Sequence, residues 1–262
     1  MATTQIIRVI YPLASGRIIL RIDDDWNRDV EAVAVDASRT TFEFHYNENT
    51  LKRYPVLYMH DGNNLFIPDE AFFNNEWRVD ETMDRLEAMN IIDKVIVVGI
   101  YPHDRMYEYT QPGYEGYGRF ITEELKKEVD AGLRTLASPG HTAVMGSSLG
   151  GVVSLYLAWQ HPEVFGKAAC LSSTFTYRDN LRQRIATEPK RNIQVYLDSG
   201  WPEDNYEVTR SMRDLLLERG YEFGKDLLYF AFPEALHSET YWATRCHIPF
   251  QFFFGKTPNF KT

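Results

Sequence analysis

Short apolar runs alternate with helix-length segments between residues 54 and 232, and this alternation limits the fold more than any other feature. The runs are "YPVLYMH", "KVIVVGI", "HTAVMG", "KAACLS", "NIQVYLDSG" and "LLYFAF". Strands with continuous apolar runs are typical of sheets that are buried on both faces. Their alternation with helices predicts an α/β fold with a mostly parallel central sheet and helices on both sides.

The first fifty residues have a different pattern. "QIIRVIY", "RIILRI", "VEAVAV" and "TTFEFHY" are short β-prone runs, and they predict an antiparallel N-terminal edge of the sheet. Two later segments have helical spacing instead. Apolar residues recur every fourth position within 119–135, and a similar stripe over 208–219 ends at Gly220, a residue typical of the position just after a helix.

The chain is predicted to be a single domain over residues 1–262. No internal repeat and no segment rich in proline, glycine and serine divides the sequence. Residues 1–50 are then a β-rich extension ahead of an α/β core over 53–254.

Charge and composition exclude several classes of partner. The formal net charge is −9, and no block of lysine or arginine offers a footprint for nucleic acid or an anionic membrane. No apolar run approaches the roughly 20 residues of a membrane span, and the start lacks a signal-peptide pattern, so we expect a cytoplasmic location.

Cys170 and Cys246 are expected to be buried apolar side chains that fill space in the core. Asp23, Asp24 and Asp25 lack the alternating ligands of a calcium loop, so no metal is predicted.

The segment "MGSSLGGVV" places a candidate nucleophile between a strand and a helix. Gly146-Ser147-Ser148-Leu149-Gly150 matches G-x-S-x-G, in which the central serine occupies a tight turn. Side chains two positions before or after it would collide, which predicts a need for glycine at 146 and 150. Ser148 is therefore the predicted nucleophile, and Gly151 is expected to allow close packing of the helix on a strand.

A serine nucleophile needs a base, and an acid that orients the base. His237 lies in the loop after the last predicted strand, whereas His247 lies within a helical stretch, so His237 is the predicted base. The acid is expected after the strand "NIQVYLDSG". Asp204 is preferred there, with Asp198 and then Glu203 as alternatives. A different role for Asp204 would be to cap the following helix.

The remaining parts of the predicted site are oxyanion donors and a pocket wall. The backbone N–H of Leu149 is one expected donor, and Asn63, preferred over Gly62, is the other. Tyr107, Tyr109 and Trp201 lie in two long aromatic loops and are predicted to contact substrate. The alternative is that several of the tyrosines in 101–118 cover the sheet.

The sequence resembles the putative-esterase family of α/β hydrolases, which includes feruloyl esterases, siderophore esterases, S-formylglutathione hydrolases and mycolyl transferases. The resemblance covers about residues 53–254. It is carried by "YPVLYMHDGNNLF", "EWRVDETMDRL", "KVIVVGI", "DRMYEYT", "MGSSLGGVVSLYLAWQHPEVFGKAACLSSTF", "YLDSG" followed by "EDN", and "ALHSETYWATR".

This resemblance implies an α/β-hydrolase fold and a carboxylic-ester hydrolase that needs no cofactor. The family's nucleophile falls on Ser148, its histidine on His237 and its acid most naturally on Asp204, while Asp198 stays open. The first fifty residues fit the family core less well, and they could bind substrate, form a dimer edge in a homo-oligomer, or cover the sheet.

The predicted function is hydrolysis of a small, aromatic-tolerant ester through an acyl-enzyme. Acyl transfer to an alcohol, sugar or thiol would use the same Ser148. A non-catalytic binding protein with the same fold is a third possibility, which the complete set of candidate residues counts against.

Overall fold

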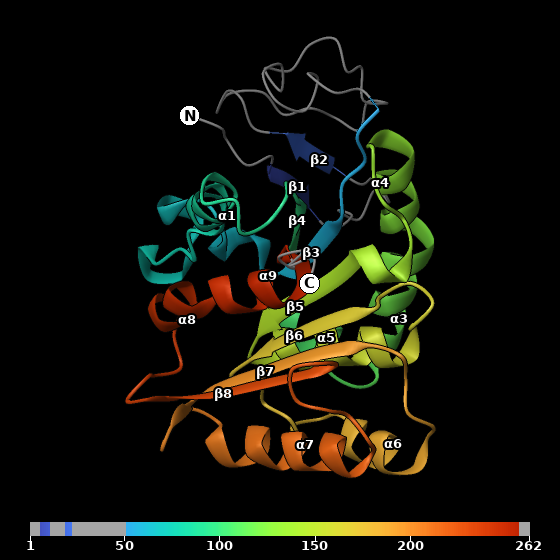
Figure 1. The fold of residues 1–262 in the computed structure, drawn as a ribbon, viewed down its shortest axis with the longest axis vertical. Helices are drawn as coiled ribbons and strands as arrows, with labels where there is room; N and C mark the ends of the chain where they lie inside the picture. Colours follow the sequence, from blue (N-terminus) through green and yellow to red (C-terminus); the bar gives the residue numbers. More distant parts are fainter. Residues whose placement is uncertain (1–5, 11–18, 23–50, 257–262) are drawn as a thin grey trace, which may run out of the picture.

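The computed structural model describes residues 6–10, 19–22 and 51–256, where a central sheet is flanked by helices (Figure 1). The strands follow the order β2-β1-β4-β3-β5-β6-β7-β8. The six from β3 onward pair in parallel throughout. These strands are β3 (Val56–His60), β4 (Ile96–Tyr101), β5 (Thr142–Ser147), β6 (Lys167–Leu171), β7 (Gln194–Trp201) and β8 (Leu227–Pro233). The predicted α/β architecture is confirmed.

The N-terminal edge differs from the prediction. β1 (Ile6–Ile10) joins the sheet in parallel beside β4, and β2 (Ile19–Ile22) pairs antiparallel with β1. A wholly antiparallel N-terminal edge is therefore not supported, because β1, which joins it to the sheet, is parallel to β4, and of the described strands β2 alone is antiparallel to its neighbour. Alternating side chains indicate a half-buried strand but not its direction, which is why the sequence pattern could not decide this. The runs "VEAVAV" and "TTFEFHY" and the Asp23–Asp25 stretch lie outside the described residues.

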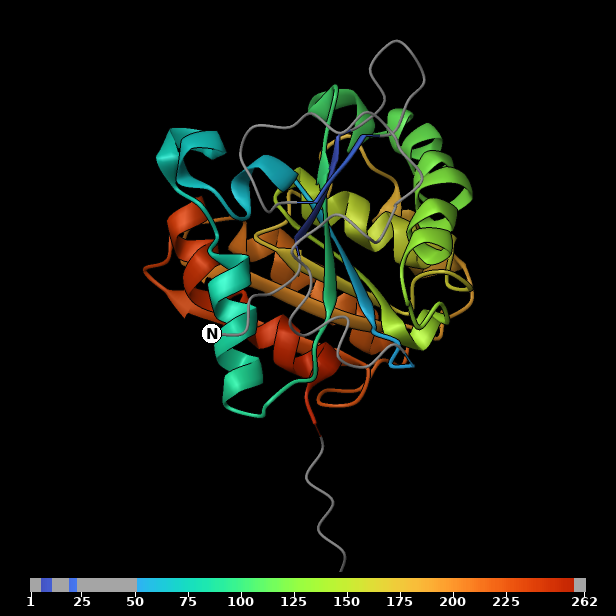
Figure 2. The ribbon, with the colours of Figure 1, turned by 90° about the horizontal axis from the view of Figure 1, so that it is seen from above.

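Alternate residues of the strands enter two separate cores, one on each face of the sheet. Val56 and Tyr58 of β3 belong to one core, and Leu57 and Met59 to the other. The second core is completed by α1 (Val79–Ala88), α8 (Glu239–Arg245) and α9 (His247–Phe254). In Figure 2, α1 in teal and the green α3 and α4 lie on opposite sides of the sheet.

The remaining helices of the described chain include those that cover the first core. They are α2 (Arg105–Glu108), α3 (Gly113–Phe120), α4 (Lys126–Gly132), α5 (Leu149–Gln160), α6 (Leu181–Thr187) and α7 (Tyr206–Glu218). A π-helical turn, Ile121–Leu125, joins α3 to α4, so the predicted helix over 119–135 is present as one continuous segment. α7 confirms the second predicted helix, and Gly220 after it has a φ of 86°.

Parallel strands bring the loops that follow them to one edge of the sheet, where ligands bind in open α/β folds. The loops after β3, β4, β5, β7 and β8 carry the predicted site residues. Short 3₁₀ turns occur in these loops and before β5, at Gly62–Asn64, Pro68–Glu70, Phe72–Asn74 and Pro139–His141. Within residues 51–256 and the two N-terminal strands, no helix is long and apolar enough to cross a membrane.

Candidate active site

Ser148 occupies a sharp turn, called the elbow here, between the end of β5 and the start of α5. Its φ of 55° and ψ of −121° are unusual for a residue with a side chain. A Cβ at Gly146 would lie 2.7 Å from the carbonyl carbon of Gly150, so only glycine fits at 146. A Cβ at Gly150 would meet no atom closer than 3.4 Å. The predicted steric demand therefore holds for Gly146 but not for Gly150, because the collision is with backbone on one side only.

Gly151 allows α5 to approach the neighbouring strand. A Cβ at this position would lie 3.2 Å from the Cα of Cys170 in β6 and still closer to Ser173. This agrees with the predicted packing role. Cys170 and Cys246 are both buried and free.

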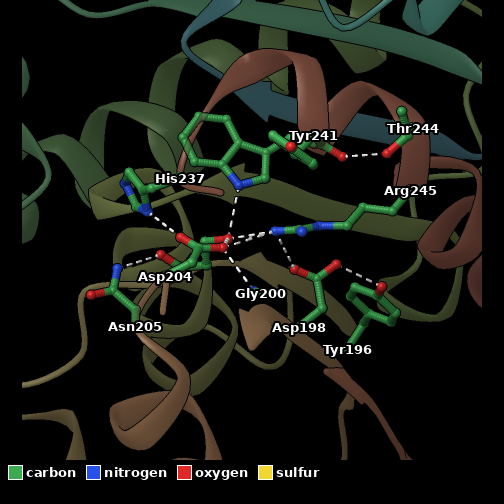
Figure 3. A network of polar contacts seen from close by, with 11 residues as sticks. Tyr196, Asp198, Gly200, Asp204, Asn205, His237, Tyr241, Thr244 and Arg245 are labelled. Carbon is green, nitrogen blue, oxygen red and sulfur yellow. Dashed lines mark hydrogen bonds and ion pairs between the residues drawn. The ribbon is translucent and has the colours of Figure 1, made fainter. Parts of the chain in front are cut away.

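His237 is hydrogen-bonded to Asp204, the preferred acid (Figure 3). The distance from Nδ1 to Oδ1 is 2.6 Å. Burial alone would raise the pKa of Asp204, but hydrogen bonds from His237, Ser172 and the N–H of Gly200 outweigh burial and lower it. An ionised carboxylate can only accept a hydrogen bond, so Nδ1 carries the proton. The neutral imidazole then has a lone pair on Nε2, the atom that a general base uses.

The two alternative acids occupy different surroundings. Asp198 is fully buried, accepts a 2.7 Å hydrogen bond from the Tyr196 hydroxyl, and lies 3.2 Å from Arg245. Burial raises the pKa of Asp198 to about 6. Glu203 is exposed. Asp204 does not cap α7, since its carboxylate accepts from Gly200, four residues earlier, at 2.8 Å. The contacts with the imidazole thus favour Asp204.

Ser148 is linked to this pair through the loop after β6. The carbonyl of Ser148 accepts a 3.3 Å hydrogen bond from the N–H of Thr174, and Ser172, two residues earlier, donates to Asp204 at 2.6 Å. Among the described residues, no hydrogen bond joins the Ser148 hydroxyl to His237 directly. Such contacts are often loose until a substrate is bound. The roles of Ser148, His237 and Asp204 therefore remain predictions.

The expected oxyanion donors lie at the starts of two helices. Leu149 is the first residue of α5, where a backbone N–H has no partner within the helix and the helix dipole favours negative charge. Asn63 and Gly62 belong to the Gly62–Asn64 turn, in which the N–H of Asn64 is already bonded to the carbonyl of Asp61 at 2.9 Å. The donor role of Leu149 and Asn63 stays a prediction.

The tyrosine-rich loop buries some of its rings in the core and leaves another exposed. Tyr109, Tyr114 and Tyr117 are fully buried and pack in the core beside α5, whereas Tyr107 is 54% exposed. The hydroxyl of Tyr109 accepts a hydrogen bond from the N–H of Asp61 at 3.1 Å. Tyr109 therefore supports the loop after β3 and offers no surface to substrate, which corrects the prediction for this residue. Trp201, at the end of β7, is 48% exposed and remains a candidate for the pocket wall.

An ion pair beside the elbow was not predicted. Arg105 donates to both oxygens of Asp61, at 2.7 and 2.9 Å, in the two-pronged geometry that favours arginine over lysine. The Asp61 carboxylate lies 3.4 Å from the Cβ position of Gly150. Asp61 directly follows β3, and Arg105 lies four residues after the end of β4. Charged residues near the carboxyl ends of parallel strands were the signal that could have indicated them.

A second unpredicted group surrounds Asp204. It consists of Ser172 after β6, and of Trp242 and Arg245 on α8. Trp242 and Arg245 are three residues apart, the spacing that places two side chains on one face of a helix. That spacing, directly after the predicted base, was the available signal. Within the part of the chain that the structure describes, no cluster of three or more histidine, cysteine, aspartate or glutamate side chains is arranged to hold a metal ion.

Comparison with known proteins identifies the family. The profile of the family described as "Putative esterase" matches residues 37–245. The chain belongs to this family. Membership makes the protein an esterase, and the parallel sheet with its strand-to-helix elbow agrees with the α/β-hydrolase type.

Individual relatives of this esterase are distant in sequence. The "Uncharacterized protein YbbA" of Bacillus subtilis (strain 168) is 22% identical over 228 residues, which cover 78% of this chain and 86% of YbbA. A ferulic acid esterase from Anaeromyces mucronatus, solved with ferulic acid, has a TM-score of 0.63 at 15% identity, over 96% of this chain and 89% of that chain. The enterobactin esterase FES from Shigella flexneri has a TM-score of 0.61 at 16% identity, over 76% of this chain and 52% of that chain. At these identities the structural neighbours establish the fold.

Proposed function

We propose that this esterase is a serine carboxylic-ester hydrolase that forms an acyl-enzyme on Ser148, with His237 as base and Asp204 as the acid that orients it. The observation that carries the proposal is the hydrogen bond from the His237 imidazole to the Asp204 carboxylate, in loops that follow β7 and β8 at the same edge of the sheet as the elbow. Ser148 has the strained backbone that presents a nucleophile at such a turn.

In the acylation step, Nε2 of His237 takes the proton of the Ser148 hydroxyl as Oγ attacks the ester carbonyl carbon. The carbonyl oxygen becomes negative and accepts from the N–H of Leu149 and from the 62–63 turn. The imidazolium, stabilised by Asp204, then gives its proton to the leaving alcohol as the carbon–oxygen bond breaks. Water repeats the sequence on the acyl-enzyme, releasing the acid and restoring Ser148.

Exposed apolar side chains around the strand ends support a small aromatic ester as substrate. We call Phe72, Phe73, Tyr107, Trp201 and Leu236 the apolar rim, since they are exposed and lie at or after the carboxyl ends of β3, β4, β7 and β8. Surfaces of this kind favour aromatic or apolar groups over charged ones. Ferulic acid and enterobactin esterases among the structural neighbours are compatible with this class.

Replacing the serine tests the proposal. Ser148→Ala is expected to lower kcat on an activated aryl ester by about 10⁴-fold or more, since the nucleophile is lost. Ser147→Ala, which changes the adjacent buried serine, is the matched control and should keep most of the activity. A fluorophosphonate probe should label wild type and Ser147→Ala but not Ser148→Ala.

Two results would contradict the proposal: equal turnover by wild type and Ser148→Ala, or labelling at another residue. Partition of the acyl group between water and an added alcohol distinguishes hydrolysis from acyl transfer. We expect the free acid to be the main product.

A further inference from the structure

The hydrogen bond between Asp204 and His237 rests on a buried polar cluster that lies behind it, away from the imidazole (Figure 3). The cluster contains Ser172, Asp198 and Arg245, which have relative exposures of 0%, 0% and 2%. Burying a guanidinium costs free energy unless it is paired. Arg245 is paired with two carboxylates, those of Asp198 and Asp204.

The hydroxyl of Ser172 has its hydrogen bonds fixed by its neighbours. Oγ accepts from Trp242 Nε1 at 2.8 Å and from Arg245 Nη2 at 2.5 Å. A hydroxyl has two lone pairs and one proton, so both acceptor positions are used. The single proton must therefore point at the remaining neighbour, Oδ2 of Asp204, 2.6 Å away. Arg245 and Trp242 thus turn Ser172 into an obligatory donor to the acid.

These contacts decide how the Asp204 carboxylate is oriented. Oδ2 accepts from Ser172 and from the N–H of Gly200, and it also lies 3.4 Å from Arg245 Nη2. With Oδ2 occupied, Oδ1 is left for Nδ1 of His237. The cluster holds one carboxylate oxygen in place and directs the other at the imidazole.

Asp198 balances the charge of the arginine. The same Nη2 of Arg245 that reaches Ser172 and Asp204 also lies 3.2 Å from Oδ1 of Asp198. The other oxygen of Asp198 accepts from the hydroxyl of Tyr196. Asp198 therefore competes with Asp204 for one buried cation, and its charge controls how much of the positive field acts on Asp204 and His237.

We propose that Arg245 is a positioning residue for Asp204, acting through the Ser172 hydroxyl, and that Asp198 is the counter-charge that adjusts its effect. For catalysis, this inference rests on the proposed function. The arrangement of the carboxylate and imidazole that it describes is independent of whether an ester is turned over.

The test measures the titration of His237 itself. The pKa of its imidazole is followed by the NMR signal of Cε1–H, which His237→Asn identifies by its disappearance. The titratable and charged groups that face the cluster and the imidazole are Asp198, Asp204, Glu239, Arg245, Tyr196, Cys170 and Cys246. The variants change two of these groups and leave the others in place.

Asp198→Asn removes a negative charge with almost no change in shape. The unopposed Arg245 should then make the imidazolium less stable, and the pKa of His237 should fall by about 0.5 unit or more. Adding Arg245→Met to this variant removes the cation as well. The pKa of His237 should then return toward the wild-type value, because the two changes have opposite signs.

Catalytic constants separate positioning from substrate binding. In Arg245→Met/Asp198→Asn, kcat on the aryl ester should fall about tenfold or more while KM stays within about threefold. Arg245→Lys keeps the charge, but its ammonium does not reproduce the position of Nη2 beside Ser172 and the two carboxylates, so it should keep the pKa of His237 near wild type and recover only part of kcat.

An unchanged pKa of His237 in Asp198→Asn would overturn the inference, and this near-isosteric variant gives an answer even if the arginine variants do not fold. A loss of kcat with no change in the pKa of His237 in any variant would also overturn it, since that is the result of a packing role alone. If wild type has no esterase activity but the pKa changes occur, the proposed function fails and the positioning of Asp204 stands.

Discussion

His60, at the carboxyl end of β3, illustrates how single residues support the elbow without taking part in chemistry. Its side chain packs against the rings of Tyr109 and Tyr117, and Nδ1 is 2.9 Å from the Tyr117 hydroxyl. The Cβ of His60 lies 3.4 Å from the Cβ position of Gly150. Burial, and to a lesser extent the charge of Arg105, lowers the pKa of His60 to about 3.

The low pKa of His60 predicts a loss of stability in acid. In the native state His60 stays neutral until about pH 3, whereas in the unfolded chain it gains a proton below about pH 6.5. The unfolded state therefore binds more protons in this range, and the free energy of unfolding falls as pH falls from 6.5 toward 3. Between pH 6.5 and 5, wild type should lose about 1.6 kcal/mol more than His60→Gln.

Urea unfolding at both pH values measures this difference. His141→Gln, which changes an exposed histidine before β5, is the matched control. Parallel losses in wild type and His60→Gln would show that His60 does not titrate in this way.

At the scale of elements, the loops after β7 and β8 must pass very close to each other to bring Asp204 and His237 together. A Cβ at Gly200 would lie 1.8 Å from the carbonyl oxygen of Ala235, two residues before His237. Gly200 also donates its N–H to Asp204. A small residue at the end of β7 is thus needed for the acid and the base to meet.

Gly200→Ala should therefore separate these loops. We expect kcat/KM to fall by about tenfold or more, and the free energy of unfolding by about 1–3 kcal/mol, the usual range for an overpacked site. Gly140→Ala is the matched control, because a Cβ there meets no atom within 4 Å. Activity and thermal unfolding of both variants provide the measurement, and near-normal activity of Gly200→Ala would refute the close approach.

An element could be predicted from the sequence where the pattern that indicates it lies within the element itself. Strands β3 to β8 and the helix after the elbow were predictable because each has a continuous apolar run or a helical stripe. The direction of β1 depends on its partner β4, which no local pattern encodes. Tyr107 and Tyr109 are close together in sequence, yet one is exposed and the other buried, since the turn between β4 and α3 decides which ring faces the core. Arg245 was missed because its partners come from β6 and β7.

At the scale of the whole molecule, segments far apart in sequence bring exposed apolar side chains to the edge of the sheet that also carries the polar groups of the candidate site. The N–H of Phe72 donates a 3.0 Å hydrogen bond to the side chain of Asn64, which follows β3. The ring of Phe72 packs on the ring of Phe73. Tyr107 comes from the segment after β4, and Trp201 is the last residue of β7. The same edge of the sheet carries Arg105, Asp61 and the pair formed by His237 and Asp204. The apolar side chains there should bind the aromatic portion of an ester while the polar groups act on its carbonyl.

The apolar rim therefore predicts a loss that depends on the substrate. Trp201→Ala and Tyr107→Ala should each raise KM for an aromatic acyl ester by roughly tenfold, which corresponds to about 1.4 kcal/mol of binding free energy. For the acetyl ester of the same alcohol the change should be small, because an acetyl group has little apolar surface for these rings to contact, and kcat should be nearly constant for both. Phe223→Ala is the matched control, since Phe223 is 55% exposed but precedes β8 at the opposite edge of the sheet. Equal effects on both esters, or an equal effect of Phe223→Ala, would mean that the rim does not select the acyl group.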